Sequence, residues 1–281
     1  MLSRLRAVAA HIPPAGSAKA ALATAAGQTV HNDNPACCSV PAAASDYTPK
    51  GCFQSYAGFD RVYTTGPASS ALALVTIYDI FGFKPQTQQG ADLLAAALDA
   101  RVVMPDFFSP SPPWDTARHP PKTPEDKAAL QAFFGGPANP PDAVDKLLRV
   151  ARTLKADGAK RVVAYGLCWG GKVAILAGSK IDTPLDAIAT IHPAMLKAED
   201  TVSLDIPMAI YVSKDEPQDQ YEGIVNILKA KPFADKNDFD LYPTMFHGWA
   251  GARADLNNPE NKKLFEDVYG RLAQFVINSA A

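Results

Sequence analysis

The sequence has no excess of positive charge, no long apolar run and few cysteines. Its formal net charge is -2 over 281 residues, so the composition does not favour a surface for nucleic acid or anionic lipid. No apolar stretch reaches the roughly 20 residues that span a bilayer. The four cysteines are too sparse for a disulfide framework, which favours a reducing compartment. We therefore expect a globular protein without stable membrane insertion.

Acidic residues are missing from the N-terminal segment. No aspartate or glutamate precedes Asp33, whereas Arg4 and Arg6 are basic and alanine is abundant. This composition is typical of a mitochondrial transit peptide, and a disordered tail without a targeting role has it too. We expect residues 1–50 to form a flexible extension and residues 51–281 to form one domain. The predicted location is mitochondrial or cytoplasmic.

The N-terminal cysteines lack the spacing of a metal site. Cys37, Cys38 and Cys52 form no C-x-x-C pair and have no cluster of histidines beside them. Structural zinc sites need such pairs. We therefore interpret these thiols as structural or incidental and expect no metal.

Short apolar runs alternate with helical patterns through most of the chain. We expect strands over residues 59–66, 71–78, 101–105, 162–165, 187–191, 206–212 and 239–242, the first of them an edge strand. We expect helices over residues 86–99, 142–156, 221–230 and 259–279. This alternation predicts an α/β protein with a mostly parallel central sheet flanked by helices on both faces.

The most informative motif is Gly166-Leu167-Cys168-Trp169-Gly170, between a predicted strand and a predicted helix. Strand, Gly-x-nucleophile-x-Gly, helix is the nucleophile elbow of the α/β-hydrolase fold, here with cysteine as the nucleophile. The glycines allow the close chain approach that the elbow requires. The helix N-terminus favours a thiolate at Cys168. The alternative is a buried cysteine in a glycine-rich turn.

A catalytic base and an orienting acid follow the elbow in the expected chain order. Asp215 comes just after a predicted strand, and His247 follows the last one. His192 also ends a strand, but it precedes every candidate acid. Glu216 and Asp219 are neighbouring acids, and we prefer Asp215 because it lies nearest the predicted strand end. We expect Cys168, Asp215 and His247 to be the catalytic residues.

An oxyanion hole needs two backbone N–H groups. One is expected from Trp169, the residue after the nucleophile, and the other from Ile80, which follows the early central strand.

A proline-rich segment interrupts the α/β pattern over residues 109–141. It contains one predicted helix, which begins at Pro124 after Thr123 as the N-cap. Long insertions often cover functional sites, and Trp114 and Phe133 would supply an apolar wall. The alternative is a surface loop with a small cluster of its own.

The chain resembles the dienelactone hydrolases, and in particular their fungal branch. The motifs that carry the resemblance are Tyr78-Asp79-Ile80-Phe81-Gly82, Met104-Pro105-Asp106, Gly166 to Lys172, Ser213 to Pro217 and His247-Gly248-Trp249. The resemblance implies a Cys-His-Asp triad that opens lactones or activated esters through a thioester, without a cofactor. A binding or interaction protein on the same scaffold is the alternative.

The sequence departs from this family at two places. Asp79 stands where the bacterial members have a glutamate that tunes the thiolate, and Arg253 is the one candidate for the arginines that hold the substrate carboxylate. A surface role is the alternative for Arg253. The resemblance implies substrate contacts from Tyr78, Phe81, Trp249 and Arg253. The partner expected is a small ester or lactone, and the chain is expected to be a monomer or a homodimer.

Overall fold

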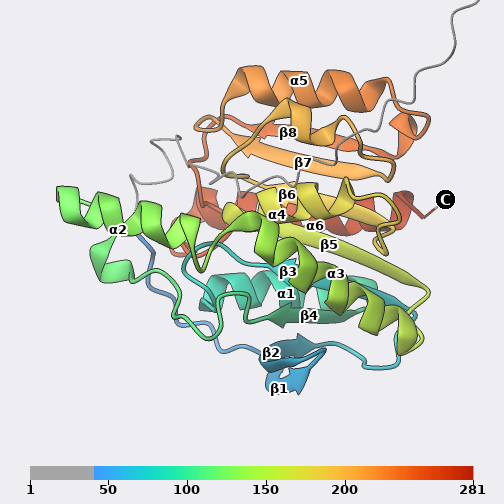
Figure 1. Cartoon of the computed structure of the whole chain (residues 1–281), viewed down its shortest axis with the longest axis horizontal. Coiled ribbons are helices and arrows are strands. Elements are labelled where there is room, and N and C mark those ends of the chain that lie inside the picture. The colour runs from blue at the N-terminus through green and yellow to red at the C-terminus, as the bar shows by residue number, and fades with distance from the viewer. Residues whose placement is uncertain (1–40, 281) are drawn as a thin grey trace, which may run out of the picture.

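A computed structural model of the chain describes residues 41–280, in which eight strands form one sheet in the order β1-β2-β4-β3-β5-β6-β7-β8 (Figure 1). The strands are β1 (Cys52–Tyr56), β2 (Phe59–Thr65), β3 (Leu72–Ile77), β4 (Arg101–Pro105), β5 (Arg161–Leu167), β6 (Ala187–Ile191), β7 (Met208–Ser213) and β8 (Asp238–Tyr242). The α-helices are α1 (Pro85–Leu98), α2 (Pro124–Gly135), α3 (Pro140–Ala156), α4 (Trp169–Gly178), α5 (Gln218–Lys229) and α6 (Pro259–Asn278). The predicted α/β class is confirmed.

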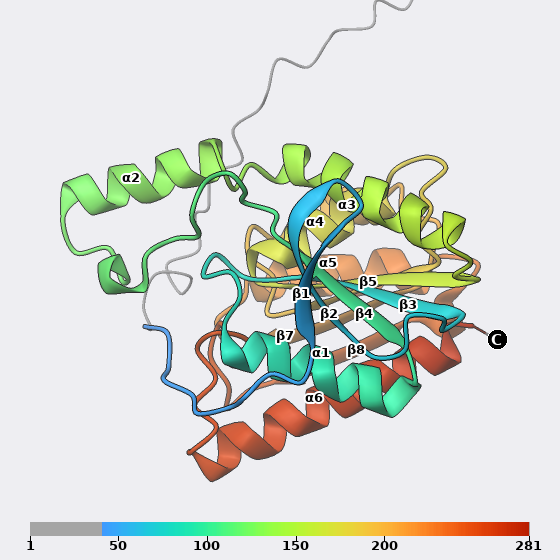
Figure 2. The same ribbon diagram turned by 90° about the horizontal axis from the view of Figure 1, so that it is seen from below.

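Helices cover both faces of the sheet. Figure 2 shows α1 and α6 side by side on one face, with α3 and α4 on the other. The central strands β3, β5 and β6 are buried on both faces, which explains their unbroken apolar runs. A single hydrophobic core fills both layers.

The edge of the sheet differs from the prediction. β2 is an inner strand, because β1 pairs with it in antiparallel register on its outer side. β1 is mostly exposed, with Phe53 at 44%, and its sequence lacks the apolar alternation that marked the other strands. The prediction that residues 59–66 form an edge strand was therefore wrong.

The six strands from β3 to β8 are all parallel to their neighbours within this group. β2 joins the group through an antiparallel pairing with β4. The carboxyl ends of the parallel strands therefore lie along one edge of the sheet. The residues that follow these ends are Asp79, Cys168, His192, Glu216 and, a few residues after β8, His247. In open α/β sheets this edge is where ligands bind.

The segment before β1 packs on the domain. The Ala43 N–H donates to the carbonyl of Ala252 at 2.9 Å. The Tyr47 hydroxyl and the Lys50 N–H both donate to Oδ2 of Asp92, each at 2.9 Å. Residues 43–50, expected to belong to a flexible extension, thus contact the domain. The predicted targeting segment, Cys37 and Cys38 lie outside the described residues.

Within residues 41–280, no helix is both long and apolar enough to cross a bilayer.

Candidate active site

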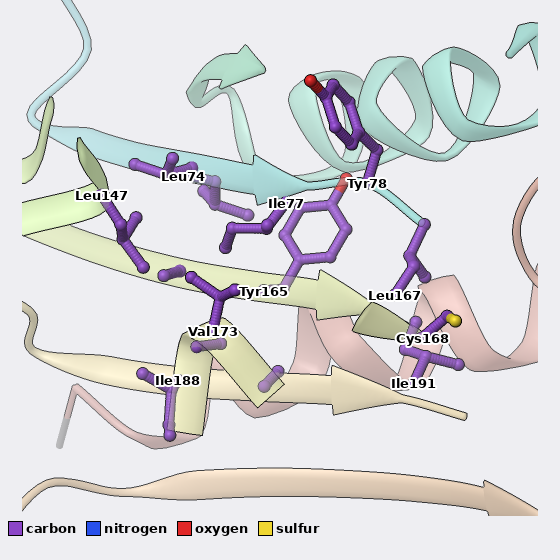
Figure 3. Close-up of a cluster of buried hydrophobic side chains, with 14 of the residues drawn as sticks. Leu74, Ile77, Tyr78, Leu147, Tyr165, Leu167, Cys168, Val173, Ile188 and Ile191 are labelled. Carbon is purple, nitrogen blue, oxygen red and sulfur yellow. The ribbon is translucent and has the colours of Figure 1, made fainter. Parts of the chain in front are cut away.

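Cys168 occupies a strained turn between β5 and α4. Its φ is 54° and its ψ is -115°, a conformation that non-glycine residues rarely adopt. A Cβ on Gly166 would lie 2.0 Å from the carbonyl oxygen of Gly170, and one on Gly170 would lie 2.1 Å from that of Ile77. Only glycine fits at either position, as the elbow motif predicts. Figure 3 shows the sulfur just past the end of β5, beside Ile191.

The loop after β6 holds this turn in place. The Cys168 N–H donates to the carbonyl of Ile191 at 3.2 Å, and the Ala194 N–H donates to the carbonyl of Cys168 at 2.9 Å. The thiol is 3% exposed and sits at the N-terminus of α4, whose first turn contains no acidic side chain. The partial positive charge of the helix end therefore acts on the sulfur without local compensation.

His247 is paired with a buried carboxylate, and the carboxylate belongs to Glu216. Its Oε1 lies 2.7 Å from Nδ1 of His247, and both side chains are fully buried. The second oxygen of Glu216 accepts from the backbone N–H of Ser213, the last residue of β7. An anionic acceptor at Nδ1 fixes the tautomer with the proton on Nδ1 and leaves Nε2 as the basic nitrogen.

The predicted acid, Asp215, also contacts His247. Its Oδ2 accepts from the backbone N–H of His247 at 2.9 Å. It therefore fixes the main chain of the histidine, while Glu216 reaches the ring. β7 extends to Ser213, one residue beyond the predicted end. Glu216 follows Asp215 in the chain, has one more methylene, and contacts the ring.

Asp79 shapes the turn that carries the expected oxyanion donor Ile80. Its Oδ1 accepts from the Phe81 N–H at 2.9 Å, and its main-chain carbonyl accepts from the Gly82 N–H at 3.1 Å. This is an Asx turn, which a glutamate is too long to form in the same way. Oδ2 accepts from the Ala252 N–H at 2.9 Å and so joins this turn to the loop after His247.

Burial raises the pKa of Asp79, because the charged carboxylate is removed from water. The two backbone N–H groups of Ala252 and Phe81, and the charges of Arg253 and His247, act in the opposite direction.

The proline-rich segment is fastened to both expected oxyanion donors. The Trp114 N–H donates to the carbonyl of Ile80 at 2.9 Å, and the Trp169 indole N–H donates to the carbonyl of Ala138 at 2.7 Å. Phe108 packs between this segment and the elbow, since its ring centre is 4.8 Å from that of Trp169 and 5.1 Å from that of Phe133. The predicted helix is present as α2, and its N-cap Thr123 accepts from Asp126. The segment packs on the site, and it is not a separate surface loop.

Arg253 is a buried cation at the same place. Its guanidinium donates to the carbonyl of His247 at 3.1 Å and lies 2.7 Å from Nε2 of His119, a residue of the proline-rich segment. An arginine donates only, so Nε2 of His119 must accept and its proton must be on Nδ1. The Phe81 ring contacts both groups, at 5.1 Å from the His119 ring and 5.5 Å from the guanidinium carbon.

Two other expected substrate contacts are packed into the core. The Tyr78 hydroxyl donates to Asp106 at 3.0 Å and accepts from the Phe108 N–H at 3.3 Å. The Trp249 ring is fully buried against Tyr242, at 4.6 Å between ring centres. Both side chains are buried and pack in the core next to the loops of the site. Phe81 and Arg253 are the expected contacts that the structure brings together.

The described residues contain no group of three or more His, Cys, Asp or Glu side chains arranged to hold a metal ion. The remaining cysteine of this part of the chain, Cys52, is exposed on β1, far along the sheet from β5.

The sheet order, the elbow and the histidine loop together define an α/β hydrolase. A profile of the dienelactone hydrolase family matches residues 61–278, and the chain belongs to that family. An uncharacterized AIM2 family protein of Schizosaccharomyces pombe is 36% identical over 245 residues, which cover 85% of this chain and 97% of the relative.

Other relatives are more distant. A carboxymethylenebutenolidase homolog of Mus musculus is 24% identical over 217 residues, covering 76% of this chain and 84% of the relative. The crystal structure of the dienelactone hydrolase from Anabaena variabilis has the same fold, with a TM-score of 0.54 at 10% identity; the match covers 83% of this chain and 98% of that one.

Proposed function

We propose that this protein hydrolyses a lactone or an activated carboxylic ester through a thioester on Cys168. The proposal rests on the buried pair between Glu216 and His247 and on a cysteine held at φ 54° in a nucleophile elbow, both at the carboxyl-end edge of the sheet. A buried imidazole with a carboxylate on Nδ1 is a general base for a neighbouring nucleophile. Membership of a hydrolase family supports the same reaction class.

In the proposed first step, Nε2 of His247 takes the proton of the Cys168 thiol. The sulfur attacks the carbonyl carbon, and the N–H groups of Ile80 and Trp169 stabilise the oxyanion, at about 3 kcal/mol for each donor. His247 then protonates the leaving oxygen as the carbon–oxygen bond breaks. Water cleaves the resulting thioester, and the carboxylic acid leaves.

Glu216 replaces Asp215 as the proposed orienting acid, because it has the contact with Nδ1. Asp79 is proposed to act on the site through the turn at Ile80, since both its oxygens accept from backbone N–H groups. Phe81 and Arg253 are the proposed substrate contacts.

The proposed substrates have good leaving groups. A thiolate displaces an enolate or a phenolate readily, whereas a simple alkoxide or an amine returns to expel the sulfur. Lactones with enol leaving groups and aryl esters should therefore be cleaved faster than alkyl esters. A reducing environment keeps a catalytic thiol from oxidation, and on this ground we infer an intracellular location, mitochondrial or cytoplasmic.

The test compares the natural protein with Cys168→Ala and Cys168→Ser on p-nitrophenyl acetate and a panel of lactones. We expect Cys168→Ala to abolish turnover and the thioester adduct in intact-mass spectra. The exposed Cys52 offers a matched control, since Cys52→Ala removes a thiol outside the site. Equal activity of Cys168→Ala and the natural protein would exclude the nucleophile.

A second measurement separates an enzyme from a binding protein on the same scaffold. Iodoacetamide should alkylate Cys168 at pH 6, well below the ordinary thiol pKa of about 8.5. A thiol that is inert at pH 6, together with absent turnover, would favour the binding protein.

A further inference from the structure

His192 is a buried imidazole that the proposed mechanism does not use. It follows β6 directly and is 0% exposed. Its backbone N–H donates to the carbonyl of Tyr211 in β7 at 2.8 Å, and the residue before it, Ile191, accepts from the Cys168 N–H. Hydrogen bonds thus fix the main chain around His192 to the elbow on one side and to β7, which leads to Glu216, on the other.

The ring of His192 faces the proposed base. Its centre is 5.3 Å from that of His247, with 67° between the ring planes. Neither ring nitrogen of His192 has a hydrogen-bond partner on another residue within the range 41–280. Burial and the charge of His247 hold its pKa well below the usual range; a contact with its own backbone acts in the opposite direction, and the charge of Arg253 adds to the lowering. The ring is therefore neutral, with one nitrogen that donates and one that accepts.

This arrangement is costly for folding. A buried polar group without a partner on another residue destabilises the fold, and His192 also has a φ of 41°, in the left-handed region. An apolar side chain would avoid the first cost, and glycine would avoid the second. Buried polar groups and strained backbone of this kind concentrate where a site has a chemical use for them.

Thioester cleavage supplies that use. A water bound in a closed site needs two or more polar partners, and one acceptor alone leaves it free to rotate. The base provides one acceptor. A second acceptor at the neighbouring ring would direct the oxygen lone pair at the acyl carbon.

We propose that His192 is a second catalytic imidazole, which accepts a hydrogen bond from the water that cleaves the acyl-enzyme. The inference rests on the thioester mechanism proposed above. One O–H of the water transfers its proton to Nε2 of His247, while the other O–H donates to His192. The oxygen bonds to the acyl carbon, the carbon–sulfur bond breaks with its electron pair on Sγ of Cys168, and the proton on His247 returns to the sulfur.

The experiment resolves acylation from deacylation with p-nitrophenyl acetate in stopped flow. In His192→Phe, which keeps a ring and removes both nitrogens, we expect the burst of p-nitrophenolate to keep its rate within about threefold. Steady-state turnover should fall by about 10- to 100-fold, and the acetyl-enzyme should accumulate in intact-mass spectra. Hydroxylamine attacks a thioester without a positioned water, so it should restore much of the turnover.

A second variant guards against misfolding. Asparagine tolerates the left-handed backbone and provides an acceptor oxygen, so His192→Asn should deacylate faster than His192→Phe. Thr190→Val is the matched control, because Thr190 lies two residues earlier in β6 with a buried hydroxyl that also lacks a hydrogen-bond partner among the described residues. It should leave the ratio of burst rate to turnover unchanged.

Two results would overturn the inference while the proposed function stands. One is a deacylation rate in both variants equal to that of the natural protein. The other is an equal loss in acylation and deacylation, which indicates support of His247 alone. The proposed function fails separately, if the natural protein itself forms no acyl-enzyme on Cys168.

Discussion

Nδ1 of His247 lies 2.7 Å from Oε1 of Glu216, whereas the carboxylate of Asp215 accepts from the main-chain N–H of the same histidine. Two adjacent acids thus serve one residue, one through its ring and one through its backbone. Because the contacts differ, substitution of each acid should have a different effect on activity.

We expect Glu216→Gln to lower kcat/KM by about 10²- to 10⁴-fold, because an amide at Nδ1 permits the wrong tautomer. Asp215→Asn keeps an oxygen that accepts from the His247 N–H, so its loss should stay below about tenfold. Steady-state kinetics on an aryl ester measures both. The reverse order of effects would return the orienting role to Asp215.

Asp79 should contribute more to stability than to thiol reactivity. Asp79→Ala leaves the buried N–H groups of Phe81 and Ala252 without their acceptor, at a cost of about 1–3 kcal/mol each. Asp79→Asn keeps one acceptor and should lose less. Urea unfolding measures both losses. Unchanged stability combined with a large shift in the pH dependence of Cys168 alkylation would instead support a thiolate-tuning role.

The Trp169 indole should anchor the proline-rich segment. Trp169→Phe removes the donor to Ala138 and should increase the rate of trypsin cleavage within residues 109–141. Trp114→Phe is the control, because the Trp114 indole nitrogen has no hydrogen-bond partner within the described part of the chain. Equal cleavage rates in the two variants would show that the bond to Ala138 does not hold the segment.

His192 should make the protein less stable in mild acid. Its pKa is lowered in the folded state by burial and by the charges of His247 and Arg253, so the unfolded chain binds a proton below pH ~6.5 that the folded protein does not. Stability is therefore lost as pH falls below that value, by at most about 1.4 kcal/mol per pH unit for this group.

Urea unfolding between pH 7 and pH 5 measures this loss of stability. His192→Asn has no such proton to bind, so its stability should fall less steeply with acid than that of the natural protein. Parallel curves for the two proteins would show that His192 is protonated in the fold.

The sequence predicted the parts of the fold that local pattern determines. β3, β5, β6 and β7 are buried apolar runs, and the elbow glycines have a steric requirement that the sequence states directly. The sequence does not predict β1, because an exposed strand that is paired on one side needs no apolar alternation.

The sequence does not predict those contacts of the site that depend on the direction of side chains. β7 ends one residue later than expected, and Glu216 contacts the ring of His247 while Asp215 contacts its main chain. The pairing of His119 with Arg253 depends on how an irregular proline-rich segment folds back over the sheet, and no spacing in the sequence encodes it. His192 was recognised as a strand-end histidine, but its lack of polar partners is a property of the packing around it.

The position of Ala252 decides how much of the N-terminal segment the fold can lose. Its N–H donates to Asp79 and its carbonyl accepts from Ala43, so the N-terminal arm is bonded to the loop that carries Arg253. A processing enzyme that cut before Pro41 would leave this bond intact. A cut after Ala43 would remove it and release one side of the loop, so a chain that begins after Ala43 should unfold more easily than one that begins at Pro41.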